Sequence, residues 1–278
     1  MTLATFIPEV WSATLLILLK KTFVYAQVLA NHDYEGEIAG QGDTVHITSI
    51  SKPTISDYTV GAALVYEQLT TADRTLIINQ AKSFSFEVDD IDKAQAAGSV
   101  IASAMELAAY ALADATDQYI AGMYNQASAA NQLGTVSVTT ADLAYKSLVQ
   151  LGTRLTAANV PMTGRVVVIP PWYEELMIQD ARFTNAFATG EPSAAITGFV
   201  RRAAGFDIFV SNNTVNVTGD DWAVIAGVPA AITFADQISQ VEALRLQGTF
   251  ADALRGLHVY GAKVVRPEAI ATVIASQT

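Results

Sequence analysis

The sequence predicts an α+β fold from three observations. Polar and apolar side chains alternate along both ends of residues 41–88, which is the period of a half-buried strand. Residues 91–122 carry an apolar stripe with the three- and four-residue spacing of one long helix. Most of residues 161–278 consists of short strand-like segments separated by turns. Strands and helices thus occupy largely separate stretches, as in α+β proteins.

The composition sets limits on function. The chain has 278 residues, of which 51% are hydrophobic and 15% are charged, and its net charge is −11. This composition is too apolar for a disordered chain. The surplus of apolar surface indicates that neighbouring molecules cover part of the protein. A nucleic-acid reader is disfavoured, because an acidic surface repels phosphate. The lack of cysteine excludes disulfides and thiolate metal sites.

The N-terminal segment, residues 1–40, predicts an arm that docks on another element. Residues 15–19 have the apolar character of a signal-peptide core, but Glu9 stands where such a peptide needs positive charge. No cleavage site of small residues follows. Because Pro8 suits a first helical position, the segment is predicted to form an amphipathic helix.

Residues 41–88 predict an extended hairpin that projects from the body. Its legs, residues 42–48 and 75–88, carry the alternating pattern of strands. Between them, residues 51–58 contain Pro53 and few core-forming side chains, as expected of an exposed tip. A two-stranded ribbon is only marginally stable in water. We therefore expect the hairpin to be mobile in an isolated chain and to be ordered by a neighbour that it covers.

The acidic segment 89–92 predicts the start of the long helix. Carboxylates there can accept free N–H groups of the first turn and interact favourably with the helix dipole. Other elements or molecules must cover most of the helix, because few of its residues are charged. A membrane span over residues 94–113 is disfavoured, since Glu106 and several polar residues interrupt it and no Lys or Arg follows its end.

The rest of the chain predicts further helices and strands. Thr140 and Asp142 begin a second helix that reaches about residue 159, and Pro161 ends it. Residues 165–169 form a short apolar strand, and a helix follows from Trp172. The remaining strands are predicted at residues 206–211, 222–226, 231–234 and 241–246, with 257–260 and 269–275 as a returning strand pair.

Enzymatic alternatives find little support. Gly40 and Gly42 lack the third glycine of a dinucleotide-binding loop and precede a strand instead of a helix. The histidines are far apart in the sequence and are predicted to be ordinary loop or strand residues: His32, His46 and His258. Acidic pairs could supply the two carboxylates of a glycoside hydrolase, although helix starts and turns also favour them: Asp89-Asp90, Glu174-Glu175 and Asp220-Asp221. No catalytic, cofactor-binding or metal-binding residue is predicted, and a hydrolase remains an alternative.

The order of several segments is informative. They are GDTV at 42–45, FSFEVDDID at 84–92, VVVIP at 166–170, GFDIFVSN at 205–212 and YGAKVVRPE at 260–268. Together with the N-terminal arm and the long helix, this order resembles the major capsid protein (coat protein) family of tailed bacteriophages. The resemblance covers nearly the whole chain, and its specificity lies in order and spacing, since no segment is a catalytic signature.

The resemblance implies the tailed-phage major capsid fold. Residues 1–40 would form the N-terminal arm and residues 41–88 the extended loop. Residues 89–160 would contain the spine helix and the first part of the peripheral domain. Residues 161–240 would form the axial domain, and residues 241–278 would return to the peripheral domain.

The implied function is structural. The chain would self-assemble into hexamers and pentamers of an icosahedral shell that encloses double-stranded phage DNA without sequence-specific binding. A separate scaffolding protein is expected, because capsid-like sequence begins within the first few residues. A portal protein and a decoration protein are further expected partners, and no membrane or cofactor is involved. The expected location is the virion capsid, assembled in the host cytoplasm. An encapsulin-type compartment shell is the alternative with a similar fold.

Overall fold

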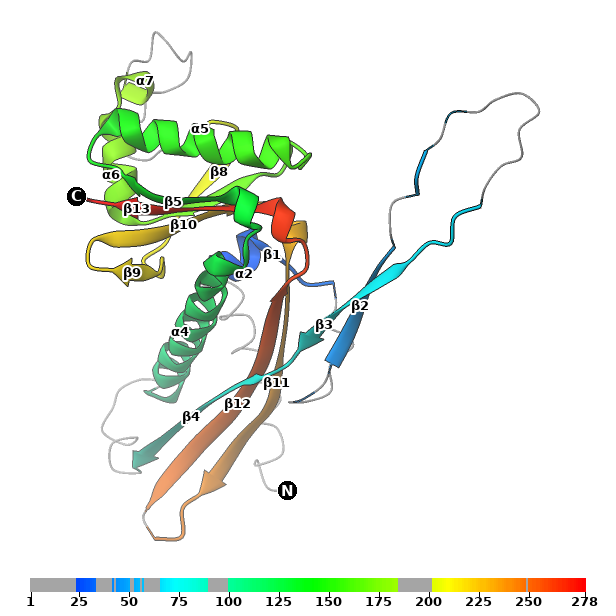
Figure 1. The fold of residues 1–278 in the computed structure, drawn as a ribbon. Coiled ribbons are helices and arrows are strands. Elements are labelled where there is room, and N and C mark those ends of the chain that lie inside the picture. Colours follow the sequence, from blue (N-terminus) through cyan, green and yellow to red (C-terminus); the bar gives the residue numbers. More distant parts are fainter. Residues whose placement is uncertain are drawn as a thin grey trace.

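The computed structural model describes residues 24–33, 42, 44–50, 53–55, 57, 66–89, 100–184, 202–248 and 250–278. The predicted amphipathic helix of the N-terminal arm lies outside the described residues, and so does the predicted start of the long helix. The described part of the chain mixes helices and strands, which confirms the α+β class. Its strands form two sheets and a separate hairpin (Figure 1).

The larger sheet has seven strands. They are β5 (Gln132–Ser137), β6 (Val166–Ile169), β7 (Arg202–Ala203), β8 (Phe206–Val210), β9 (Asn216–Thr218), β10 (Asp221–Gly227) and β13 (Ile270–Ser276). The order is β5-β13-β10-β6-β8-β7, and β9 pairs with β10. The predicted apolar strand is β6, which is buried along its whole length between antiparallel β10 and parallel β8. A wholly apolar strand is expected where both faces of a sheet are covered.

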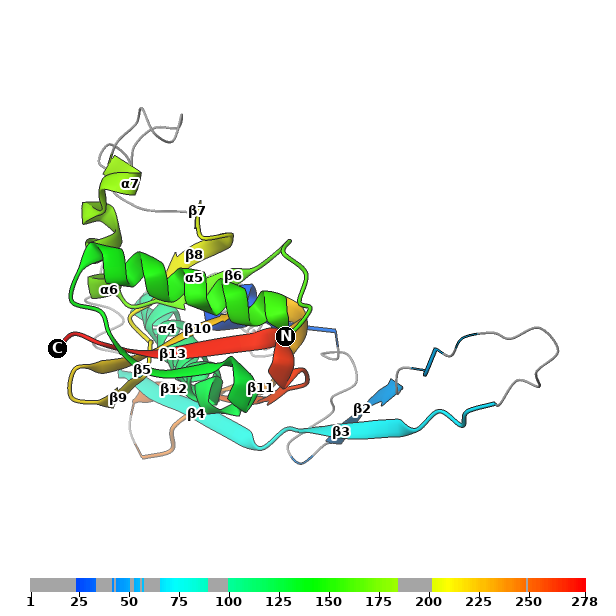
Figure 2. The same ribbon diagram turned by 45° about the horizontal axis from the view of Figure 1, so that its top comes forward.

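Helix α5 (Ala141–Ala157) lies across this sheet over β13 and β5 (Figure 2). Thr140 begins it as predicted, because its Oγ1 accepts the N–H of Leu143 at 3.4 Å. The side chains of Leu148, Leu151 and Leu155 are fully buried. Helix α6 (Pro171–Gln179) follows β6 and packs against α5, and the short α7 (Ala181–Thr184) follows α6.

The smaller sheet has four strands in the order β1-β11-β12-β4. They are β1 (Ala30–Asn31), β4 (Gln80–Asp89), β11 (Ile232–Arg245) and β12 (Ala251–Val264). The long helix is described as α4 (Val100–Ala121), and it runs beside this sheet (Figure 1). The ring of Tyr119 on α4 meets the ring of Tyr260 on β12 edge to face, with 5.6 Å between centroids. Helix α2 (Tyr25–Val28) packs on α4.

One correction concerns residues 231–246, where the sequence predicts two strands. The structure has one strand, β11, which pairs with β12 along its whole length. The register shifts once, between Ile238 and Gln240, so a bulge accommodates the irregular middle of the strand. The polar residues that suggested a break do not interrupt pairing, because ladder hydrogen bonds come from the backbone.

A second correction concerns the predicted returning pair at 257–260 and 269–275. These strands are β12 and β13, and they lie in different sheets. The 3-10 helix Pro267–Ala269 redirects the chain between them. The N–H groups of Val265 and Arg266 both bond to the carbonyl of Ala231, which holds the end of β12 beside β11.

Sheet membership also crosses the segment boundaries that the resemblance implied. β5 and β13, expected within the peripheral domain, share one sheet with β6 and β8 of the expected axial domain. β11 passes residue 240 without interruption. The strand at the end of the chain therefore shares a sheet with central strands that are distant from it in the sequence.

The predicted hairpin consists of β2 (Thr44–Ile50) and β3 (Thr71–Ile77), which pair antiparallel from Thr44 with Ile77 to Ile50 with Thr71. It projects away from both sheets in two views (Figures 1 and 2). The second predicted leg is divided between two structures. Residues after Ile78 form β4, which pairs with β12 in the smaller sheet.

Candidate functional site

The acidic pairs proposed for catalysis lie on separate elements. Asp89 ends β4, Glu174 and Glu175 lie in α6, and Asp221 begins β10 after Asp220 in the preceding turn, whereas Asp90 lies outside the described residues. Among the described residues, no group of three or more His, Asp or Glu side chains could hold a metal ion. The described carboxylates of the acidic pairs therefore lie on different elements, and none of them belongs to a metal-binding group in the part of the chain that the structure describes.

The histidines are also separate. The His32 ring nitrogen Nε2 lies 3.0 Å from the carbonyl oxygen of Ala26, and Nδ1 of His46 lies 2.6 Å from Asp73 on the hairpin surface. His258 is buried, with Nε2 3.2 Å from Asp236 across β12 and β11. Each ring has its own local partner, as expected of structural residues. In the described ranges, no helix is both long and apolar enough to cross a membrane.

The base of the β2–β3 hairpin has a small core of its own. We call it the base cluster; its members are Val45, Ile47, Leu76, Ile78, Ala235 and Val259. The first four come from the hairpin and its exit, whereas the last two come from β11 and β12. Their burial attaches the hairpin to the smaller sheet, because apolar surface removed from water stabilises contact at about 25 cal/mol per Å².

The far end of the hairpin is apolar and exposed. The side chains of Ile55 and Tyr66 are each 90% exposed. Leu69 is also exposed, and the backbone N–H of Thr54 bonds to the Glu67 carboxylate across the two sides. Large apolar side chains exposed together indicate a contact surface for another molecule.

The body carries further exposed apolar side chains. On α4, Leu107 is 70% exposed and Tyr110 is 61% exposed, one turn apart on the same face. Phe250 is 81% exposed in the connection between β11 and β12. The exposed side chains of α4 thus lie mainly between residues 103 and 111, and coverage of this face by neighbours stays a prediction.

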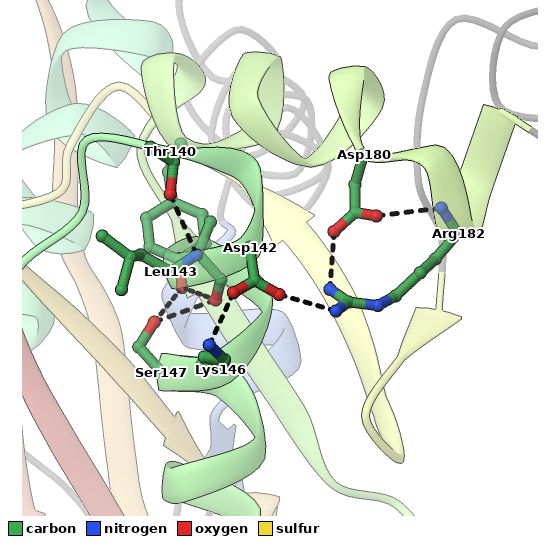
Figure 3. A network of polar contacts seen from close by, with 9 residues as sticks. Thr140, Asp142, Leu143, Lys146, Ser147, Asp180 and Arg182 are labelled. Carbon is green, nitrogen blue, oxygen red and sulfur yellow. Dashed lines mark hydrogen bonds and ion pairs between the residues drawn. The ribbon is translucent and has the colours of Figure 1, made fainter.

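A polar network joins the start of α5 to α7 (Figure 3). Asp142 lies between two cations, 2.6 Å from Nζ of Lys146 and 2.6 Å from the Arg182 guanidinium. Arg182 also contacts Asp180 at 2.9 Å and lies 4.6 Å from the centre of the Tyr145 ring. The hydrogen bonds from Lys146 and Arg182 lower the pKa of Asp142. The sequence analysis missed this network, because Asp142 and Arg182 are 40 residues apart.

A buried hydrogen bond joins α5 to α6 beneath this network. The hydroxyl of Tyr173 donates to the carbonyl of Ala144 at 2.7 Å and also contacts Ser147. Burial raises the pKa of Tyr173 above its ordinary range, so the hydroxyl keeps its proton. Hydrogen bonds and ion pairs therefore connect α5, α6 and α7 to one another on the larger sheet.

Comparisons with known proteins agree with this architecture. A sequence model described as phage capsid protein matches residues 72–273. The chain is similar to a structure from Mycobacterium phage Che8, with 35% identity, a TM-score of 0.77, and 92% of this chain and 91% of that chain covered. No curated protein matches the sequence.

Two more distant structures share the fold. The capsid of cyanophage P-SCSP1u has 16% identity and a TM-score of 0.75, over 92% of this chain and 89% of that chain. A virus-like particle from Pyrococcus furiosus has 16% identity and a TM-score of 0.57, over 96% of this chain and 98% of that chain.

Proposed function

Because the chain belongs to the phage capsid protein family, we propose that its copies assemble into hexamers and pentamers of an icosahedral shell around double-stranded DNA. The structural role in a capsid and the tailed-phage capsid fold follow from the family and from the matched structures.

The projecting hairpin is the observation that carries the proposal. Its base is attached to the body through the base cluster, whereas Ile55 and Tyr66 at its far end are exposed. An isolated chain gains nothing from apolar side chains held in water, but a neighbour that receives them buries their surface. In the proposed shell, the hairpin lies over an adjacent copy.

The exposed faces of the body supply the complementary contacts. Leu107 and Tyr110 on α4 lie where an adjacent copy can cover them, and Phe250 extends from the end of the β11–β12 pair. Aromatic side chains such as these are enriched at the centres of protein interfaces. We propose that they contribute to contacts between copies within and between capsomers.

The proposal includes a non-enzymatic role and further partners. A scaffolding protein would direct shell size, a portal protein would occupy one vertex, and a decoration protein would bind outside. The DNA would be held without sequence-specific contacts, which agrees with the net charge of −11. Assembly would take place in the host cytoplasm and end in the virion capsid.

Electron microscopy of the purified chain, expressed with and without its proposed scaffolding partner, tests this function. Closed shells of uniform size with pentameric and hexameric capsomers are expected with the partner. Particles taken from virions should contain nuclease-protected DNA. Shells that enclose a protein cargo and no DNA would instead indicate an encapsulin-type compartment. Only monomers or small oligomers under both conditions would contradict assembly itself.

A further inference from the structure

The chain crosses itself at the base of the hairpin. β4 pairs with β12 as far as Gln80, which lies opposite Tyr260. The preceding residues, Ile77 and Ile78, lie over Gly261, the next residue of β12. The hairpin therefore joins the body at a point where one backbone rests directly on another.

Gly261 permits this crossing because it has no side chain. A Cβ at this position would lie 2.6 Å from the carbonyl oxygen of Ile77 and 3.0 Å from Cα of Ile78. Both are backbone atoms, so a change of side-chain rotamer cannot make room for it. Since protein interiors are close-packed, any side chain at residue 261 must move the crossing segment as a whole.

Two further contacts hold the segment beside the crossing. Leu76 and Ile78 are fully buried in the base cluster, against Ala235 and Val259 of the smaller sheet. The hydroxyl of Tyr119 on α4 donates to Oδ1 of Asn79 at 3.2 Å. The exit of β3 is thus supported on one side by apolar packing and on the other by the backbone at Gly261.

We propose that the backbone contact at Gly261 sets the angle at which the β2–β3 hairpin projects from the body. The distance between the two backbones at the crossing and the position of the base cluster together determine the direction of β3. The hairpin therefore keeps a fixed direction before a second copy binds. In an assembled shell this direction would decide where the hairpin meets an adjacent copy, a consequence that rests on the proposed function, whereas the angle itself is a property of the single chain.

The geometry gives the size of the effect. A methyl group at residue 261 would displace the crossing by roughly 1 Å to reach ordinary contact. Ile78 at the crossing and Leu76 are separated by two residues, or about 7 Å of strand, and Thr71 at the far end of β3 lies five residues, or about 17 Å, beyond Leu76. A tilt about Leu76 therefore moves the far end of β3 by about 2 Å.

Distance measurement by pulsed electron paramagnetic resonance tests the proposal. The chain has no cysteine, so nitroxide labels can be placed at T71C, at the end of β3, and at Q150C, on exposed α5. The measurement uses the full-length, unassembled chain and compares Gly261→Ala with the parent. Because no shell is needed, a failure of assembly does not affect the readout.

Gly256→Ala is the matched control. It makes the same substitution in the same strand, but its Cβ would meet the Phe84 ring instead of the hairpin backbone. The parent and G256A should give one narrow distance distribution with the same mean. In G261A the mean should shift by about 2 Å, or the distribution should become clearly broader.

Several results would overturn the proposal. A broad distance distribution in the parent would show that the hairpin has no fixed direction in the free chain. An unchanged mean and width in G261A, or an equal shift in G256A, would show that the crossing does not set the angle. If circular dichroism shows that G261A does not fold, Ile78→Ala replaces it, since this variant loosens the base cluster without a clash. I78A should broaden the distribution, and an unchanged width would equally refute the proposal that the crossing and the base cluster fix the angle.

Discussion

The carboxylate of Asp117 accepts a hydrogen bond from the backbone N–H of Tyr25, 92 residues away in the sequence, at 3.2 Å. Its second oxygen accepts the N–H of Val24 at 2.9 Å. Helix α2 has no capping side chain of its own, so a residue of α4 satisfies its free N–H groups. Asp117 is only 2% exposed, and burial raises its pKa to about 6, while its bonds from the backbone oppose the shift.

The variant Asp117→Asn should lose a pH dependence of stability. The pKa of Asp117 is raised from 3.8 to about 6 in the folded chain. The folded state therefore binds the proton more tightly than the unfolded state between these values, and stability falls as pH rises through this window. The free energy of unfolding of the parent, relative to D117N, should decrease by roughly 2–3 kcal/mol from pH 4 to pH 7. Urea unfolding at several pH values measures it, and parallel curves for the two proteins would contradict the prediction.

Replacing Arg165 should destabilise the body. Arg165 is buried, and its guanidinium donates to the carbonyls of Gly152, Val160 and Pro161 around the end of α5, and to the hydroxyl of Thr156. Burial lowers the pKa of Arg165, but the carbonyls at a helix C-terminus favour the cation. Arg165→Met removes these four hydrogen bonds; the Gly152 carbonyl keeps the Thr156 hydroxyl as a donor, and for the loss of the others we expect about 3 kcal/mol.

Chemical denaturation of R165M and of the control Arg165→Lys measures this loss. Lysine keeps the charge and the reach but offers fewer, differently arranged donors, so R165K should recover only part of the stability. Equal stability of R165M and the parent would show that Arg165 is not needed to satisfy the end of α5.

Asp142→Asn should loosen α7 without unfolding the body. The carboxylate holds Arg182 and Lys146 at the surface, and such pairs contribute little to global stability. The pKa of Asp142 is lowered, so its contribution is present at neutral pH and is lost as pH falls through that value. Amide hydrogen exchange should accelerate in residues 180–184, while the midpoint of thermal unfolding stays nearly constant. Unchanged exchange in D142N would contradict a role for Asp142 in anchoring α7.

Removing the far end of the hairpin should abolish assembly and spare folding. Replacing residues 51–70 with a short Gly-Ser link keeps β2, β3 and the base cluster. The variant should be a soluble monomer that unfolds cooperatively, because both sheets and the main core are untouched. Electron microscopy should show no stable shells. Normal shells would show that the exposed apolar end is not an intersubunit contact, and failure to fold would show that it belongs to the core.

Affinity for duplex DNA should be weak in unassembled copies. The chain has 27 acidic and 16 basic side chains, so few counterions are released on binding. Titration of labelled duplex at about 0.15 M salt should give a dissociation constant weaker than roughly 10 μM. Submicromolar binding would reveal a basic surface that the overall charge conceals.

Local patterns in the sequence were sufficient to predict many elements. Alternation indicated β2 and β4, the Thr140 cap and leucine spacing indicated α5, and an apolar run before a double proline indicated β6. These signals are short-range, because helix caps and strand periods depend on neighbouring residues. The order of the segments also predicted the family.

The sequence by itself thus determined the class of fold, most helices and strands, and the structural role, since each leaves a periodic or ordered trace along the chain. The tertiary structure alone decided which strands pair beyond the β2–β3 hairpin. β12 and β13 are adjacent in sequence but lie in separate sheets, because the Pro267–Ala269 turn redirects the backbone. It also decided the cap of α2 by Asp117 and the crossing at Gly261. The sequence around a single carboxylate or glycine looks the same whatever its role. The role arises only when folding brings a distant segment into contact with that residue.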